Sequence, residues 1–223
     1  MKLKLVKKII EAKNTYSFFF EPDTTFDWQA GQYLVLKING QERQLTIASS
    51  PTEKIIQITV RIRKESEFKQ SLNNLKIGDT SEANGPFGSF VLPNPDSLIP
   101  SHLFLAGGIG VTPFRSMIKY NIDKGLKIPM YLAYSNSGPD FVFKKELDIW
   151  QKENDFIKIY YRDSAISGHL DVAKLSSLYT IYDIQHTNFY AVGPKMFVNS
   201  MEDILEEMKV PQDNIKTEKF IGY

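Results

Sequence analysis

Apolar and polar residues alternate along most of the first 92 residues of the chain, which is the pattern of half-buried strands. The alternating segments are rich in Ile, Val, Thr, Tyr and Phe, and they cover residues 3–10, 15–22, 32–38, 43–49 and 55–63. Turn-forming pairs separate these segments, and Asn39-Gly40 suits a hairpin whose turn needs positive φ. Many short strands joined by close turns predict a small antiparallel barrel.

Two segments interrupt the alternation. Residues 67–75 place Phe68, Leu72 and Leu75 on one face at helical spacing, which predicts a short helix. The run Gly85-Pro86-Phe87-Gly88 consists mainly of residues that break regular structure, so it predicts a loop.

The second half of the chain alternates short apolar strands with helices. The predicted strands cover residues 102–108, 129–134, 157–161, 187–193 and 214–221. The predicted helices start at Pro113 and cover residues 140–153, 171–178 and 194–208. This alternation predicts a doubly wound parallel sheet, which binds ligands at the carboxyl ends of its strands.

A proline-rich segment separates the two patterns. Three prolines fall within residues 93–100, which predicts a linker. We therefore expect a small barrel domain over residues 1–97 and an α/β domain over residues 98–223.

Composition and charge exclude several classes of protein. The chain has no cysteine, which excludes disulfides, thiolate nucleophiles and cysteine-ligated zinc or iron–sulfur clusters within these 223 residues. Twenty-seven Lys and Arg against 26 Asp and Glu give a net charge of +1, so we expect no nucleic-acid partner. The three histidines lack metal-ligand spacing, and no metal site is expected.

The most apolar stretch does not predict a membrane span. Residues 98–114 contain three glycines and two prolines and fall short of the ~20 apolar residues that a span needs. The first ten residues alternate charged and apolar side chains, unlike a signal peptide. A soluble, cytoplasmic protein is the expectation.

Glycines mark the points where two of the predicted parallel strands lead into helices. The first is the segment from Leu103 to Pro113, in which Gly107, Gly108 and Gly110 would let a ligand approach the backbone. Thr112 is a plausible N-cap there, and the free N–H groups of the helix would face a pyrophosphate. The alternative is a glycine-rich turn that only packs. Gly193-Pro194 opens the next helix in the same way and strengthens the expectation of a nucleotide site.

Five segments in this order resemble the ferredoxin–NADP reductase family of flavoproteins. They are RQLTIAS (43–49), GPFGSF (85–90), AGGIGVTPF (106–114), the turn from Gly193 to Met196, and EKFIGY (218–223). RQLTIAS resembles the Arg-x-Tyr-Ser flavin motif of that family. The resemblance covers the whole chain and implies a six-stranded flavin-binding barrel followed by an NAD(P)-binding α/β domain.

Within the barrel, the resemblance assigns roles to three residues of the RQLTIAS segment. Arg43 would hold the flavin pyrophosphate, for which a planar cation is suited. Thr46 stands where the family usually has Ser and would place a hydroxyl near flavin N5. Leu45 stands where an aromatic ring usually covers the isoalloxazine, so stacking on that face is lost.

Other barrel residues align with positions further along the flavin. Val60, Arg61 and Ile62 align with the strand whose backbone follows the ring and the ribityl chain. Lys69 stands where the family has a Ser that contacts phosphate, and its charge could serve the same oxygens. The alternative for Lys69 is a solvated side chain.

In the second domain, the resemblance implies that Gly107, Gly108, Gly110 and Thr112 cradle the nicotinamide dinucleotide, with Gly193 and Pro194 beside it. The family often has Cys before Gly-Pro, whereas this chain has Val192, so no thiol assists the transfer.

Two assignments stay open at the ends of the dinucleotide site. Tyr223 resembles a C-terminal aromatic residue that stacks on the flavin, and a frayed chain end is the alternative. Arg162 aligns with a position that can bind a 2′-phosphate, but Asp163 beside it weakens that assignment. NADH and NADPH both remain open as donors.

The resemblance implies an FAD-dependent oxidoreductase, with FMN as the alternative flavin. It would take hydride from NAD(P)H and pass electrons to a separate acceptor such as ferredoxin, flavodoxin or another redox protein. One alternative is an NAD(P)H:flavin reductase that uses flavin as a substrate. Another is a non-catalytic electron-transfer subunit that only binds nucleotide.

Overall fold

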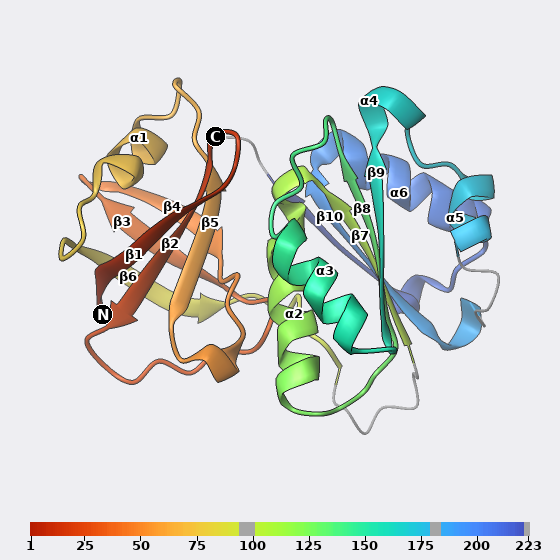
Figure 1. Cartoon of the computed structure of the whole chain (residues 1–223), viewed down its shortest axis with the longest axis horizontal. Coiled ribbons are helices and arrows are strands. Elements are labelled where there is room, and N and C mark those ends of the chain that lie inside the picture. Colours follow the sequence, from red (N-terminus) through yellow and green to blue (C-terminus); the bar gives the residue numbers. More distant parts are fainter. Residues whose placement is uncertain (94–100, 179–183, 221–223) are drawn as a thin grey trace.

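The structure is a computed structural model and describes residues 1–93, 101–178 and 184–220. It contains a β-barrel and an α/β unit that pack side by side (Figure 1). The boundary expected between residues 97 and 98 lies outside the described residues, as does most of the expected linker.

The barrel is a six-stranded antiparallel sheet with the order β4-β3-β6-β1-β2-β5. Its strands are β1 (Lys2–Ala12), β2 (Thr15–Pro22), β3 (Tyr33–Ile38), β4 (Gln41–Thr46), β5 (Ile56–Arg61) and β6 (Thr80–Phe87). A bridge between Ile47 and Ile58 brings the end of β4 against β5 and closes the sheet on itself. The predicted hairpin is present, because Asn39 and Gly40 both have positive φ between β3 and β4.

Smaller elements complete the barrel. Helix α1 (Glu67–Asn74) agrees with the predicted short helix and buries Phe68 and Leu72 against the barrel core. A 3-10 turn, η1 (Pro51–Glu53), precedes β5 and carries Glu53 at the boundary with the second unit.

The second unit is a five-stranded sheet in which every neighbouring pair is parallel, as the sequence predicted. Its strands are β7 (Ser101–Gly107), β8 (Met130–Asn136), β9 (Ile157–Asp163), β10 (Thr187–Pro194) and β11 (Ile215–Phe220), in the order β11-β10-β7-β8-β9. Three short 3-10 turns lie between these elements: η2 (Gly108–Val111), η3 (Ile184–His186) and η4 (Gln212–Asn214).

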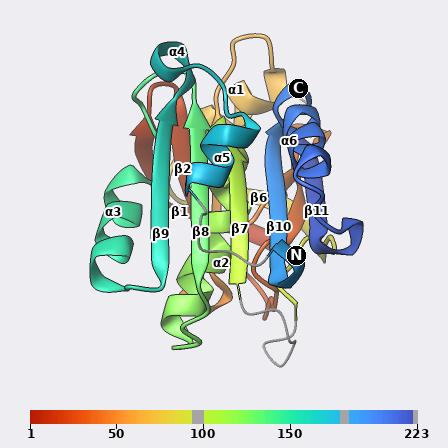
Figure 2. The same ribbon diagram turned by 90° about the vertical axis from the view of Figure 1, so that its right-hand side faces the viewer.

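Helices cover both faces of this sheet. Helices α2 (Thr112–Asp123) and α3 (Lys144–Glu153) lie on the side of the barrel (Figure 1). Helices α5 (Val172–Leu178) and α6 (Lys195–Glu207) cover the face turned away from it (Figure 2), and α4 (Ser164–Ser167) follows β9. Among the described residues, no helix has the length and apolar character needed to cross a membrane.

Three sequence predictions about local structure are wrong. Gly85-Pro86-Phe87 is not a loop but the end of β6, where Phe87 pairs with Tyr33. The register shifts opposite Leu34, and such a bulge tolerates proline because no ladder hydrogen bond is needed there.

The other two corrections concern helix starts. Thr112 is not an N-cap, because η2 runs directly into α2 and the Thr112 hydroxyl donates backwards to the Ile109 carbonyl. Helix α3 begins at Lys144 rather than residue 140, because Phe143 has a left-handed φ of 62° that a helix cannot continue through.

Arg115 on α2 joins the two units. Its side chain is 5% exposed and donates to the Ala48 carbonyl at the end of the flavin-motif segment. It also pairs with Glu53 from the barrel at 2.8 Å and with Glu146 from α3 at 2.6 Å. Ser116 adds a hydrogen bond to the Ser49 carbonyl, so α2 is fixed against the barrel at two successive residues.

Candidate active site between the two domains

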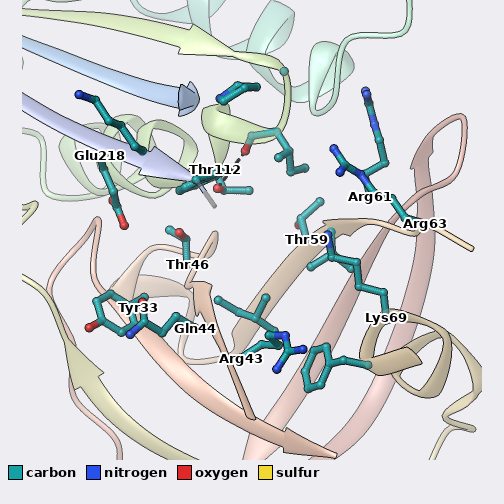
Figure 3. Close-up of a pocket in the computed structure, with 18 of the residues that line it drawn as sticks. Tyr33, Arg43, Gln44, Thr46, Thr59, Arg61, Arg63, Lys69, Thr112 and Glu218 are labelled. Carbon is teal, nitrogen blue, oxygen red and sulfur yellow. Dashed lines mark hydrogen bonds between the residues drawn. The ribbon is translucent and has the colours of Figure 1, made fainter. Parts of the chain in front are cut away.

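A cavity of about 550 Å³ lies between the barrel and the carboxyl edge of the parallel sheet. Its size falls within the roughly 300–1,000 Å³ of small-molecule sites. Figure 3 shows Thr46 from the barrel and Thr112 and Glu218 from the second unit facing the same space. The structure places nine of the expected site residues in the lining: Arg43, Leu45, Thr46, Val60, Arg61, Lys69, Gly108, Thr112 and Pro194.

Cations gather at the end of the cavity beside α1. Arg43, from β4, lies with its guanidinium 5.7 Å from the centre of the Phe68 ring and donates to the Glu42 carbonyl at 2.7 Å. Burial lowers the pKa of Lys69, and the nearby charges of Arg63 and Arg43 lower it further. These residues repel one another, so an anion bound among them would be stabilised. We call Arg43, Arg63 and Lys69 the cation cluster.

The wall of the cavity along β3, β4 and β5 is mixed. Leu45 and Val60 supply apolar surface, and Thr46 supplies a hydroxyl. Tyr33 pairs with Thr46 across β3 and β4 and brings an aromatic ring into the lining. Its ring lies against Phe87, with ring centres 5.9 Å apart. The cavity therefore has an aromatic wall although position 45 is a leucine.

The glycine-rich turn contains two kinds of glycine. A Cβ at Gly107 would lie 2.7 Å from the Phe197 ring, and a Cβ at Gly110 would lie 2.2 Å from the Val192 carbonyl oxygen. A Cβ at Gly193 would lie 3.0 Å from Gly107. These three glycines are required by packing and lie outside the cavity lining.

Gly108 is different, because it lines the cavity. Its φ is +55°, and the nearest neighbour of a Cβ there would be Asn136 Oδ1 at 3.7 Å. The backbone at Gly108 is therefore open to a ligand. The packing interpretation therefore applies to Gly107, Gly110 and Gly193, and the ligand-binding interpretation stays a prediction for Gly108.

Glu218 was not among the predicted site residues. It lies on β11, lines the cavity, and has its pKa raised by burial. Glu218 and Tyr33 also line a second cavity of about 370 Å³. The signal in the sequence was the place of Glu218 at the start of the EKFIGY segment, where no role was assigned to it.

The remaining lining residues that sequence reasoning missed come from segments far apart along the chain. They are Gln44, Thr59, Arg63, Phe68, Ile109, Lys195, Lys219 and Phe220, in addition to Tyr33 and Glu218.

Three other expected site residues lie elsewhere. Ile62 packs against the barrel core. Arg162 is the second-last residue of β9, and its guanidinium donates to the carbonyls of Ser167 and Gly168. Tyr223 lies outside the described residues.

The residues in the cavity fit a flavin and a nicotinamide dinucleotide. The cation cluster suits a pyrophosphate, the Leu45, Val60 and Tyr33 wall suits a planar ring, and the open backbone at Gly108 suits a second dinucleotide. A barrel and a parallel sheet that share such a cavity define a two-domain flavin- and nicotinamide-dependent oxidoreductase.

Comparisons with known proteins agree with this class. Residues 2–92 match the family described as "Oxidoreductase FAD-binding domain", and residues 104–203 match "Oxidoreductase NAD-binding domain". The chain is 27% identical to flavohemoprotein A of Dictyostelium discoideum, over 96% of this chain and 58% of that protein. It thus spans about three-fifths of the length of the flavohemoproteins it matches.

Solved structures share the fold over nearly the whole chain. The flavohem-like FAD/NAD-binding domain of nitric oxide dioxygenase from Vibrio cholerae has a TM-score of 0.84 and 22% identity, covering 98% of each chain. The ferredoxin-NADP+ reductase of Plasmodium falciparum has a TM-score of 0.82 and 21% identity, covering 98% of this chain and 95% of that one. The chain belongs to the ferredoxin–NADP reductase-like family of FAD- and NAD(P)-dependent oxidoreductases.

Proposed function

We propose that this protein oxidises NAD(P)H by hydride transfer to FAD and delivers the electrons to an acceptor in a separate protein or domain. The flavin supplies the chemistry that divides a hydride into single electrons. One observation carries the proposal: a single cavity places Thr46 and the cation cluster of the FAD-binding domain against Gly108 and Thr112 of the NAD-binding domain.

The cation cluster would hold the FAD pyrophosphate. Arg43 offers a planar fork of donors that suits phosphate oxygens, and Lys69 and Arg63 add charge nearby. Leu45, Val60 and Tyr33 would enclose the flavin ring, and the Thr46 hydroxyl would present a hydrogen-bonding group to it.

Gly108 and Thr112 would receive the nicotinamide dinucleotide. The open backbone at Gly108 permits close approach, and Pro194 borders the same space. Position 192 is a fully buried valine, so positioning of the reactants, at roughly 3–3.5 Å, must carry the transfer without a thiol.

The acceptor is proposed by class only. The chain is similar to flavohemoproteins and to ferredoxin-NADP+ reductases. We therefore infer that its acceptor is a haem domain, a ferredoxin or a flavodoxin. The family matches end at residue 92 and resume at residue 104, which supports a domain boundary at residues 97 and 98.

The first test is the visible absorption spectrum of the FAD-loaded protein before and after anaerobic NADH or NADPH. Bleaching of the oxidised flavin bands by one nucleotide is expected and identifies the donor. A protein that retains no flavin and oxidises NAD(P)H only with added flavin would favour flavin as a substrate. A protein that binds flavin and nucleotide but stays oxidised would contradict the proposal and favour the binding subunit.

A pair of glycine variants locates the nucleotide site. Gly108 and Gly125 both have positive φ, at +55° and +61°, and neither has a close neighbour for an added Cβ. Gly108→Val should abolish reduction by NAD(P)H and spare FAD binding, whereas Gly125→Val carries the same backbone strain away from the cavity. Equal reduction rates in the two variants would remove the glycine-rich turn from the site.

A further inference from the structure

A buried row of hydrogen bonds runs from the cavity to a carboxylate that the proposed function does not use. Thr59, which lines the cavity, bonds through its Oγ1 to Ser17 Oγ at 2.7 Å. Ser17 Oγ bonds in turn to Glu11 Oε1 at 2.6 Å. The row therefore connects β5, β2 and β1, three neighbouring strands of the barrel.

The backbone aims Glu11 at this row. The register of β1 against β2 shifts between Ile10 and Ala12, so Glu11 is the residue at the irregularity. An irregularity of this kind redirects a side chain, and such features are frequent next to functional sites.

The hydrogens of the row all point toward Glu11. Ser17 has a single hydroxyl hydrogen and gives it to the carboxylate, which can only accept. Ser17 must then accept from Thr59, and it also accepts from Gln57 Nε2 at 2.9 Å. Thr59 gives its own hydrogen to Ser17 and accepts from Gln57 Nε2 at 3.5 Å, so it can present one remaining lone pair, and no hydrogen, to a ligand in the cavity.

Burial fixes the direction of these hydrogen bonds. Ser17 is 0% exposed, Gln57 2% and Thr59 5%, so bulk water does not reach these groups to supply other partners. Gln57 Oε1 is buried and has no hydrogen-bond partner among the described residues, which shows that acceptors outnumber donors around Ser17.

We propose that Glu11 is a positioning residue that, through Ser17, holds the Thr59 hydroxyl as a hydrogen-bond acceptor for an N–H group of the bound flavin or nicotinamide coenzyme. The inference rests on the proposed function. Both ligands carry such N–H groups, and Thr59 lines the same cavity as Gly108 and Ile109.

The row reverses when Glu11 takes up a proton. A protonated Glu11 donates to Ser17, Ser17 donates to Thr59, and Thr59 donates into the cavity, where it would oppose an N–H group. Burial raises the pKa of Glu11, and the hydrogen bond from Ser17 opposes that rise. Four other charged or titratable groups interact electrostatically with Glu11. They are Glu146 on α3, Arg115 on α2, Tyr134 on β8 and Lys7 on β1 itself.

The test is a double-mutant cycle of Glu11→Gln and Thr59→Val, read out by binding. Affinities are measured for FAD with the flavin-free protein and for NAD⁺ with the FAD-loaded protein, between about pH 5 and 8. The ligand that bonds Thr59 should bind Thr59→Val about tenfold more weakly, the effect of losing one buried hydrogen bond. The comparison between FAD and NAD⁺ identifies which ligand supplies the N–H group.

The cycle should show coupling. In the unsubstituted protein, affinity for that ligand should fall as the pH falls and Glu11 protonates, and Glu11→Gln should remove this dependence. Glu11→Gln should not weaken binding further when Thr59 is already Val, and Thr59→Ser should restore affinity. Glu21→Gln, at an exposed position near the end of β2, is the matched control and should change nothing. Additive effects of the two substitutions, or no effect on either ligand, would overturn the proposal.

A second measurement needs no ligand. The pKa of Glu11, followed by carboxyl NMR in the ligand-free protein, should rise in Ser17→Ala because a hydrogen bond to the ionised form is lost. An unchanged pKa would show that Ser17 does not donate a hydrogen bond to Glu11, and the proposal would fail. If the unsubstituted protein binds neither FAD nor NAD⁺, the proposed function fails. If it binds and reduces flavin while the cycle shows no coupling, only this inference fails.

Discussion

Cations gather at one end of the interdomain cavity, and each of them comes from a different part of the barrel. Arg43 lies on β4, Lys69 on α1, and Arg63 between β5 and α1. Burial lowers the pKa of Lys69, and the charges of Arg63 and Arg43 lower it further. An anion bound at this end would therefore be stabilised by all three cations.

Replacing Arg43 with Ala should weaken FAD binding. A hydrogen bond to a charged group contributes about 1.5–3 kcal/mol, so the dissociation constant should rise roughly ten- to hundredfold. Titration of the flavin-free protein with FAD, followed by fluorescence, measures the change. Arg162→Ala is the control, because its guanidinium is engaged by the carbonyls of Ser167 and Gly168 and lies outside the cavity. Equal affinities in the two variants would contradict the role given to Arg43.

The sequence could predict the site residues that belong to short motifs. Gly108 lies in a glycine-rich segment between a predicted strand and a predicted helix, whereas Arg43 and Thr46 were assigned roles only through the family resemblance of their segment. Tyr33 lies in none of these segments, and Glu218 lies in EKFIGY without any role assigned to it there. They reach the cavity only because β3 pairs with β4 and because β11 lies at the edge of the parallel sheet next to β10.

At the scale of the elements, periodicity predicted the parallel sheet and most of the barrel. Strand β6 was missed because its inward-facing residues, Ser81 and Ala83, are small and carry no hydrophobic alternation. The start of α2 was misplaced because η2 precedes it, and no capping residue in the sequence marks a helix that continues from a 3-10 turn.

Strand β7 carries a buried histidine that ties its stability to pH. His102 is 1% exposed and lies between Phe104 and Tyr190, with ring centres 6.2 and 5.7 Å away. Burial lowers the pKa of His102 to about 4, with a further contribution from Lys216. Above about pH 6.5, the pKa of an ordinary histidine, His102 is neutral in both the folded and the unfolded chain. As the pH falls toward 4, the unfolded chain takes up a proton that the folded protein does not, so the free energy of unfolding decreases.

Replacing His102 with Phe should make the protein less sensitive to acid. Phe keeps an aromatic ring at this position and cannot take up a proton. Between about pH 6.5 and 4, the free energy of unfolding should fall less steeply, by up to about 1.4 kcal/mol per pH unit. Urea unfolding at several pH values measures the slope. The exposed His169→Phe is the control, and an unchanged slope in His102→Phe would show that another group governs acid sensitivity.

At the scale of the whole molecule, the cavity exists only because the two units hold a fixed relation. Arg115 sits at the centre of that contact, with Glu53 on the barrel side and Glu146 on the α3 side. Burial alone would lower the pKa of Arg115, but the two carboxylates outweigh it and raise the pKa. The sequence did not predict this group, because a single arginine in an apolar helix is ordinarily solvated.

Arg115→Met should be strongly destabilising. It leaves the Glu53 and Glu146 carboxylates at a buried contact without their cation, which costs about 3–5 kcal/mol of unfolding free energy. It also removes the donor to the Ala48 carbonyl, next to the flavin-motif strand, so FAD affinity should fall with stability. Urea unfolding and FAD titration measure the two effects. Lys119→Met, one turn further along α2, is the control, because it removes only the less buried ion pair with Asp123, which contributes less than about 1 kcal/mol.

The triple variant Arg115→Met, Glu53→Gln, Glu146→Gln separates charge from packing. If the loss in Arg115→Met comes from two unpaired carboxylates, neutralising both should recover most of the stability, because an uncharged buried group is far less costly. FAD affinity should recover less, since the bond to Ala48 remains absent. A triple variant as unstable as Arg115→Met would show instead that the loss comes from the packing of the long side chain over Phe143 and Trp150, within the second unit.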